Sequence, residues 1–235
     1  MHLRDATWPE AEAAETTLAL LPVGSTEQHG PHAPLGTDSL TAQAVTDAAE
    51  AAYDGEVVVA PPIHVGVAEE HRDFSGTLWV SEDTFRQYVR ETVGSLAHHG
   101  WTRVVVVNGH GGNVDPLREV CGRITRHDTA DAWAFTWFDA VDAPDMGHGG
   151  PVETSLLRAT HPELIRDGRL DDAAETGADG WGEWVSGVNL AYDSSEFSEN
   201  GTVGDPREGS ADRGEQLLDE ATAALVALLE RVASR

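Results

Sequence analysis

The chain has 235 residues, 40% of them hydrophobic, which is enough to bury the core of one sizeable α/β domain, so we expect a single domain over residues 1–235. Its 41 acidic and 15 basic residues give a net charge of −26, a surface that disfavours nucleic acid and anionic membranes as partners. The hydrophobic content and the seven Trp residues also argue against a disordered acidic chain.

The acidic excess comes with no Lys at all, which indicates a surface adapted to high salt, where screening weakens self-repulsion, and hence a halophilic source. We see no apolar run long enough to span a membrane and no signal-peptide pattern, so a soluble, cytoplasmic protein is expected. The one cysteine, Cys121, lies in a predicted helix, and we interpret it as a small core residue rather than a nucleophile.

Strands are predicted to alternate with helices along the chain. After a short lead-in helix within 1–16, strands are expected at about 17–22, 56–60, 103–107 and 132–137. Helices are expected at about 38–52, 81–99, 114–127, from the 148–155 stretch to about 160, and at 210–233. The alternation predicts a three-layer α/β/α fold with a mostly parallel central sheet, whose ligand site lies beyond the carboxyl ends of the strands.

The stretch LPVGSTEQHGPHAPLGTD, residues 21–38, follows the first predicted strand and is rich in metal-ligand side chains. In an extended backbone Glu27 and His29 point to the same side. Asp38 can return to them through the Pro/Gly-rich turn. Two carboxylates and an imidazole suit Zn, Mn or Fe, whereas the alternative is a set of ordinary solvated loop residues.

Two further stretches follow later predicted strands. In NGHGGN, glycines let the backbone approach a ligand closely, and His110 is either a ligand or a solvated turn residue. In HGGPVETS, Glu153 stands in the first turn of a helix, where a carboxylate also suits the helix dipole, so it is a ligand or a helix-start residue. His148 is a candidate ligand or an acid/base beside a metal.

Together these stretches offer five candidate ligands: Glu27, His29, Asp38, His110 and Glu153. Five ligands with Asp38 as a bridge can hold two divalent ions about 3.5–4 Å apart, with a shared water activated to hydroxide. His148 would then protonate a leaving amine. The sequence thus predicts a hydrolase, and the alternative is a non-catalytic metal- or phosphate-binding protein.

The motifs LPVGSTEQHGPHAPLGTD, EEHRDFSGT, VVVVNGHGGN and HGGPVETS, together with GTVGDPREGSADRGEQLL, resemble the creatininase family of metal-dependent amidohydrolases. The resemblance spans nearly the whole chain, in the family's motif order. It implies a creatininase-like α/β/α fold, two divalent ions (Zn, Mn or Fe) and a homohexamer. By motif, Glu27, His29, Asp38 and His110 take ligand positions and His148 the catalytic position.

The resemblance implies a small-molecule substrate and hydrolysis of a non-peptide C–N amide bond. Creatinine and a formylaminopyrimidine nucleotide of riboflavin and deazaflavin synthesis are the candidates, and cleavage of a mycofactocin precursor peptide is the alternative. Substrate contacts are expected from Glu70, His71, Gly111, Gly112 and Trp137. Residues 161–209, with Trp181 and Trp184, are read as irregular and as part of a lid, of subunit contacts or of a peripheral core.

Two departures from creatininase itself are visible. Its NGHYEN motif has a metal-binding Glu where this chain has Gly112, and Glu153 is our candidate replacement. Of the two Trp residues that flank its substrate, Trp137 is a candidate match for one, and Pro144 stands in place of the other. Both departures disfavour creatinine as the substrate.

Overall fold

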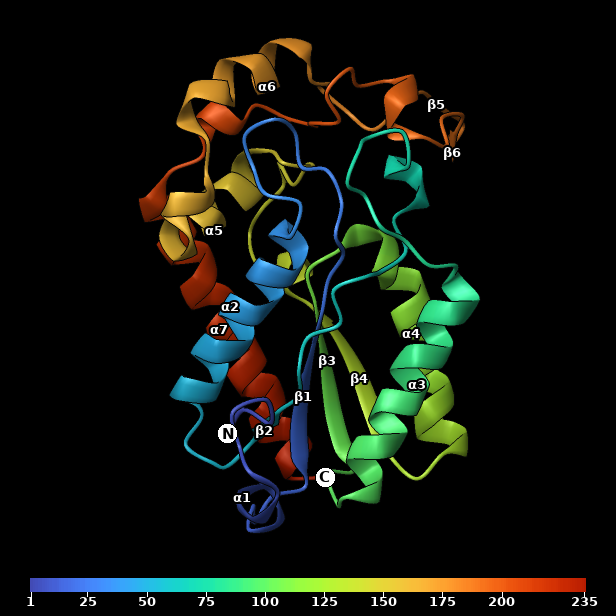
Figure 1. The fold of residues 1–235 in the computed structure, drawn as a ribbon, viewed down its shortest axis with the longest axis vertical. Helices are drawn as coiled ribbons and strands as arrows, with labels where there is room; N and C mark the ends of the chain where they lie inside the picture. Colours follow the sequence, from blue (N-terminus) through green and yellow to red (C-terminus); the bar gives the residue numbers. More distant parts are fainter.

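The computed structural model describes residues 1–235. Its core is a parallel sheet of four strands in the order β2-β1-β3-β4 (Figure 1). The strands are β1 (Leu18–Val23), β2 (Val58–Val59), β3 (Arg103–Asn108) and β4 (Asp131–Thr136). β1 is paired in parallel with β2 and β3, and β3 with β4, which confirms the predicted parallel sheet.

The chain has seven α-helices, and five of them make the outer layers on the two faces of the sheet. The seven are α1 (Trp8–Glu12), α2 (Thr37–Ala52), α3 (Glu82–His98), α4 (Val114–His127), α5 (Pro151–Thr160), α6 (Leu170–Thr176) and α7 (Ala211–Ala233). Helices α2, α5 and α7 cover one face of the sheet, and α3 and α4 cover the other (Figure 1). None of the helices combines the length and apolar character that crossing a membrane requires.

The sheet is hydrophobic on both faces because each face carries a helical layer. Along β1, Ala19 and Leu21 belong to the core cluster under α3 and α4, whereas Leu18 and Leu20 belong to the cluster under α2, α5 and α7. The valines of β3 divide in the same alternating way. This explains why both strands read as unbroken apolar runs in the sequence.

Helix ends follow the expected chemistry. The Ser81 side chain accepts a hydrogen bond from the backbone N–H of Thr84 and caps α3 at its start. Gly100, with φ +99°, follows the other end of α3, a backbone conformation that suits glycine. Pro151 occupies the first turn of α5, where its missing N–H has no helical partner to lose.

The region 161–209 holds more regular structure than we predicted. It contains α6 and a two-stranded hairpin of β5 (Trp184–Val185) and β6 (Val188–Asn189). α6 has the sequence LDDAAET, and only its Ala173 is buried. The sequence therefore lacks the hydrophobic periodicity that would predict this helix. Short 3₁₀ turns complete the chain at Glu69–His71, Gly111–Asn113, Trp137–Asp139, Pro162–Leu164, Asp167–Arg169, Ser194–Glu196 and Pro206–Glu208.

The loops that leave β1, β3 and β4 all emerge at one end of the molecule. α6 and the β5–β6 hairpin lie at this same end, opposite the chain termini (Figure 1). Because parallel strands share their direction, their carboxyl ends meet at one edge, and the three ligand-rich stretches come together there.

Cys121 is free and buried on α4, as expected for a core residue. Burial raises the pKa of its thiol to about 12. Because the thiolate is the reactive form, we expect Cys121 in the folded protein to resist alkylation by iodoacetamide at pH 7 and to react readily once the chain is unfolded. Mass spectrometry of the labelled protein measures this, and rapid, complete labelling of the folded chain would contradict the buried placement.

Candidate metal centre

Five buried side chains meet beyond the carboxyl ends of the strands. Glu27 and His29 lie on the loop after β1, and Asp38 lies in the first turn of α2. His110 lies two residues beyond the end of β3, and Glu153 lies in the first turn of α5. Each of the five is at most 4% exposed. These are the five residues that the sequence singled out as candidate ligands.

Asp38 stands between the two imidazoles of the cluster. Its Oδ2 lies 3.2 Å from His110 Nδ1, and its Oδ1 lies 3.0 Å from His29 Nε2. Glu27 Oε1 is 3.1 Å from His110 Nδ1, and Glu153 Oε1 is 3.6 Å from His29 Nε2. The geometry therefore places Asp38 between two neighbouring groups of donors, Glu27 with His110 and Glu153 with His29, and its bridging role stays a prediction.

The outer nitrogen of each imidazole is held by a backbone carbonyl. His29 Nδ1 donates to the carbonyl oxygen of Glu27 across 3.2 Å, and His110 Nε2 donates to that of Val67. When these rings are neutral, the other ring nitrogen carries a lone pair, and this lone pair faces the carboxylates. Such outer hydrogen bonds are typical of histidines that bind metal ions.

The cluster contains acceptor atoms that no hydrogen bond satisfies. Both carboxylate oxygens of Glu27, Asp38 Oδ2 and His29 Nε2 are buried without a hydrogen-bond partner. Buried acceptors of this kind are costly and rare in folded proteins. Divalent cations would satisfy all four atoms, and a set of carboxylates and imidazoles is one that Zn or Mn prefers. The residues therefore fit a metal centre.

The charges of the cluster are strongly coupled. Burial, followed by the nearby charge of Asp38, raises the pKa of Glu27 to about 7. Burial by itself would raise the pKa of Asp38, but the charges of His29 and His110 outweigh it and lower that pKa. For these two imidazoles burial favours the neutral form, yet the surrounding carboxylates raise both pKa values well above the usual one. Protons thus occupy the cluster when no cation does.

His148 lies beside the donor sets. Its ring is 4.1 Å from the ring of His29, and its Nδ1 is 3.7 Å from Glu27 Oε1. Its Nε2 donates to the backbone carbonyl of Gln28. Burial, together with the neighbouring His29 and His71, lowers the pKa of His148 well below its usual value. The ring is therefore neutral, with the lone pair of Nδ1 turned towards the cluster.

A cavity of about 390 Å³ opens onto the cluster. Of the residues that we expected to contact a substrate, Glu70, His71, Gly111 and Gly112 line this cavity. Trp137 does not line it, and the prediction for Trp137 is wrong: the side chain is fully buried in the core cluster under α2, α5 and α7. Its neighbour Phe138 lines the cavity instead.

Gly112 has a steric reason to be glycine. A Cβ at this position would lie 2.2 Å from the Val67 carbonyl oxygen and 2.6 Å from His110 Nε2. The hydrogen bond between those two groups occupies the space that a side chain would need. This chain therefore has no room for a carboxylate at residue 112, and Glu153 supplies the carboxylate beside His29 from a different helix.

Several cavity residues were missed or only partly anticipated from the sequence. Trp181, Asn189, Ala191, Tyr192, Ser194 and Phe197 line the cavity from the region around the β5–β6 hairpin. The Trp181 ring lies 6.1 Å from the ring of His148. The sequence predicts for this region a lid, subunit contacts or a peripheral core, and its aromatic residues among Gly and Ser are the only signal. Gln28, which contacts His148, gave no signal at all.

Comparisons with known proteins agree with this site. A family model described as creatininase, creatinine amidohydrolase, matches residues 4–229. The mycofactocin precursor peptide peptidase of Mycolicibacterium smegmatis is 35% identical over 209 residues, which cover 86% of this chain and 80% of that protein. The creatinine amidohydrolase of Pseudomonas putida is 30% identical over 198 residues, 72% of this chain and 75% of that protein.

The fold is shared with solved creatininases. A structure of creatininase with Mn superposes with a TM-score of 0.84 at 23% identity, covering 100% of this chain and 99% of that one. The segments that match other mycobacterial peptidases span only 61–64% of those proteins' own lengths. With the family model matching almost from end to end, and with the family's motifs meeting in one buried cluster, the chain belongs to the creatininase family.

Proposed function

We propose that this protein is a metal-dependent hydrolase that cleaves a C–N amide bond and uses two divalent ions, Zn, Mn or Fe. One observation carries the proposal: buried, unpartnered acceptor atoms of Glu27, Asp38 and His29 converge with His110 and Glu153. Divalent cations in such a centre lower the pKa of water and polarise a carbonyl oxygen, the two requirements of amide hydrolysis.

The two donor sets divide the five ligands. Glu27, Asp38 and His110 form one set. In the other, His29 lies beside both Glu153 and the shared Asp38, and His148 is the further side chain that lies close to His29 and Glu153. The backbone N–H of Gly149 donates to Glu153 Oε2 across 2.6 Å, which holds that carboxylate and leaves Oε1 towards His29. Glu153 thus fills the role that Gly112 cannot fill in this chain.

His148 is the proposed proton carrier. Its Nδ1 is unprotonated and faces the cluster, so it can accept a proton from an attacking water and return it to the leaving nitrogen. The backbone carbonyl of Gln28 holds the ring in this orientation. Backbone hydrogen bonds in both directions between His148 and Val203 fix the loop that carries the ring.

The lining of the cavity indicates the class of substrate. Glu27, Asp38, Glu70 and Glu153 line it, and no Arg does, so a substrate with a phosphate group finds no cationic side chain there. Phe138, Met146, Trp181 and Phe197 give the rest of the lining an aromatic and apolar character. The cavity volume lies in the range of drug-sized ligands. These features favour an amide next to an apolar or aromatic group over the formylaminopyrimidine nucleotide.

Two substrate candidates remain in that class. A mycofactocin-type peptide is favoured, because the relatives with that activity match this chain at higher identity than the creatinine amidohydrolase does. Creatinine is the second candidate. It is supported by the family description and opposed by the burial of Trp137 away from the cavity.

Metal content tests the donor sets. Elemental analysis of the protein purified without chelator should give about two divalent ions per chain. We expect His110→Ala to lose at least one of them, because His110 contributes the only imidazole of its set. His98→Ala, which removes an exposed imidazole of α3, is the matched control and should retain both. A metal content near zero in the unmodified protein would overturn the proposal.

Metal affinity should depend on pH. Glu27, with a pKa of about 7, and the two imidazoles with raised pKa values hold protons that a cation must displace. The apparent affinity for Zn should therefore weaken as the pH falls below 7, by about tenfold per pH unit for each proton released. Competition with a chromophoric chelator at pH 6, 7 and 8 measures this, and an affinity that is constant across the range would contradict it.

His148→Ala separates an enzyme from a metal-binding protein. The variant should keep its metal and lose turnover by roughly 10²- to 10⁴-fold, the usual contribution of a positioned acid/base. In the assay, the metal-loaded protein is incubated in molar salt with one substrate at a time. The substrates are peptides that end in apolar or aromatic residues, then creatinine, then the formylaminopyrimidine nucleotide. Unchanged turnover in His148→Ala would remove His148 from the reaction, and failure to hydrolyse any amide would favour the binding protein.

A further inference from the structure

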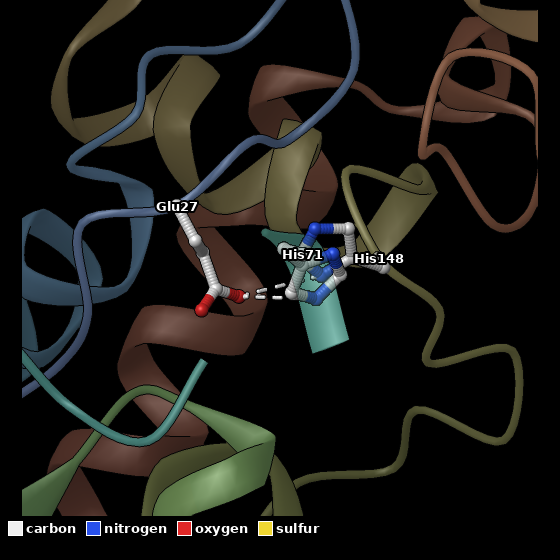
Figure 2. Close-up of side chains that lie close together, drawn as sticks. All are labelled: Glu27, His71 and His148. Atoms are coloured by element: carbon white, nitrogen blue, oxygen red, sulfur yellow. Dashed lines mark ion pairs between the residues drawn. The ribbon is translucent and has the colours of Figure 1, made fainter. Parts of the chain in front are cut away.

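Glu27, His71 and His148 form a third cluster that has the appearance of another metal site. Figure 2 shows the three side chains converging, with the two imidazoles on one side of the carboxylate. His71 Nε2 lies 3.6 Å and His148 Nδ1 lies 3.7 Å from the same oxygen, Glu27 Oε1. The two rings stack with centroids 4.2 Å apart. Whether the cluster can bind a cation depends on where the imidazole protons are.

Gln28 decides the position of one of these protons. This side chain is 5% exposed, and its orientation is fixed by two backbone groups that cannot exchange roles. Its Nε2 donates to the carbonyl oxygen of Gly201 across 3.0 Å, and its Oε1 accepts from the N–H of Gly30 across 2.9 Å. Gly201 has φ +82°, and a Cβ there would lie 2.1 Å from the amide carbon of Gln28, so the amide is firmly enclosed.

The remaining N–H of the Gln28 amide points at His71. Nε2 lies 2.8 Å from His71 Nδ1. Because the amide nitrogen only donates, His71 Nδ1 must accept, and the ring proton must be on His71 Nε2. That N–H faces Glu27 Oε1. A protonated ring nitrogen offers no lone pair, so His71 cannot bind a cation there.

His148 has the opposite arrangement. The backbone carbonyl of the same residue, Gln28, accepts from His148 Nε2, and the lone pair of His148 Nδ1 faces Glu27. One residue therefore holds two stacked imidazoles in the same Nε2–H tautomer but in opposite orientations, so that His71 presents an N–H to Glu27 and His148 presents a lone pair. At 3.6 Å the N–H of His71 Nε2 is too far from Glu27 Oε1 for a hydrogen bond, but it turns positive partial charge towards that carboxylate.

We infer that Gln28 is a positioning residue. Its amide makes His71 turn an N–H, and not a metal-binding lone pair, towards Glu27, and its backbone carbonyl leaves the lone pair of His148 Nδ1 facing the same carboxylate. The inference deepens the proposed hydrolase function, because it assigns the donor and the acceptor that flank the metal centre. It rests on hydrogen-bond geometry and concerns proton positions, which can be observed without any turnover.

Nitrogen NMR of the zinc-loaded, ¹⁵N-histidine-labelled protein tests the inference. Protonated and unprotonated ring nitrogens resonate far apart, and His71→Gln and His148→Gln assign the two rings. We expect His71 to be protonated at Nε2 and His148 also at Nε2, with both Nδ1 atoms unprotonated. A proton on Nδ1 of His71 would overturn the inference, whether or not an amide substrate is ever found.

Gln28→Glu provides the matched perturbation. A carboxylate only accepts, so the proton of His71 should move to Nδ1, whereas His148, held by the backbone carbonyl, should keep its tautomer. Gln216→Glu makes the same change on the exposed surface of α7 and should leave both rings as they are. An unchanged His71 in Gln28→Glu would overturn the assigned role of Gln28. If this variant does not fold, the spectrum of the unmodified protein still decides the question.

Zinc stoichiometry gives an independent readout. His71→Ala should still bind about two zinc ions per chain at saturation, because His71 belongs to neither donor set. His110→Ala, in the same titration, should bind fewer. Loss of a zinc ion in His71→Ala would show that His71 is a ligand, and the inference would fail even though the hydrolase proposal would survive.

Discussion

The structure depends on how negative charge is balanced at one buried point. Glu27, Asp38 and Glu153 are almost fully buried, in a chain that already carries a net charge of −26. Taking an ionised carboxylate out of water costs several kcal/mol unless a partner compensates it. His29 and His110 supply part of that compensation by holding protons, and two divalent cations would supply it fully. The buried carboxylates of this fold are therefore best compensated by bound cations.

The layered architecture explains how the side chains of the candidate metal centre are brought together. Parallel strands end at one edge, so loops that are far apart in the sequence deliver side chains to the same place. Backbone carbonyls of Glu27, Val67 and Gln28 then fix the outer nitrogens of three imidazoles. Most of the orienting groups are main-chain atoms, which a sequence does not display. The precision of the site therefore comes from the fold and not from the ligands alone.

Much of the fold and the convergence of the candidate ligands could be predicted, and the reasons are physical. The valine run of β3 and the Pro/Gly-rich loop after β1 are strong local signals, and the five candidate ligands are side chains whose chemistry is evident from their type. The orientation of Trp137 could not be predicted, because an aromatic residue next to the site can equally face the core. The role of Gln28 depends on contacts with Gly201 across 173 positions, which no local pattern reveals. The homohexamer stays a prediction.

The most direct test of the buried charge balance is anomalous X-ray diffraction from crystals of the zinc-loaded protein, measured on both sides of the zinc absorption edge. Our account predicts two anomalous peaks that share Asp38, one beside Glu27 and His110 and the other beside His29 and Glu153. A crystal soaked in excess zinc that shows no peak at Asp38, or a peak between His71 and His148 instead, would contradict it.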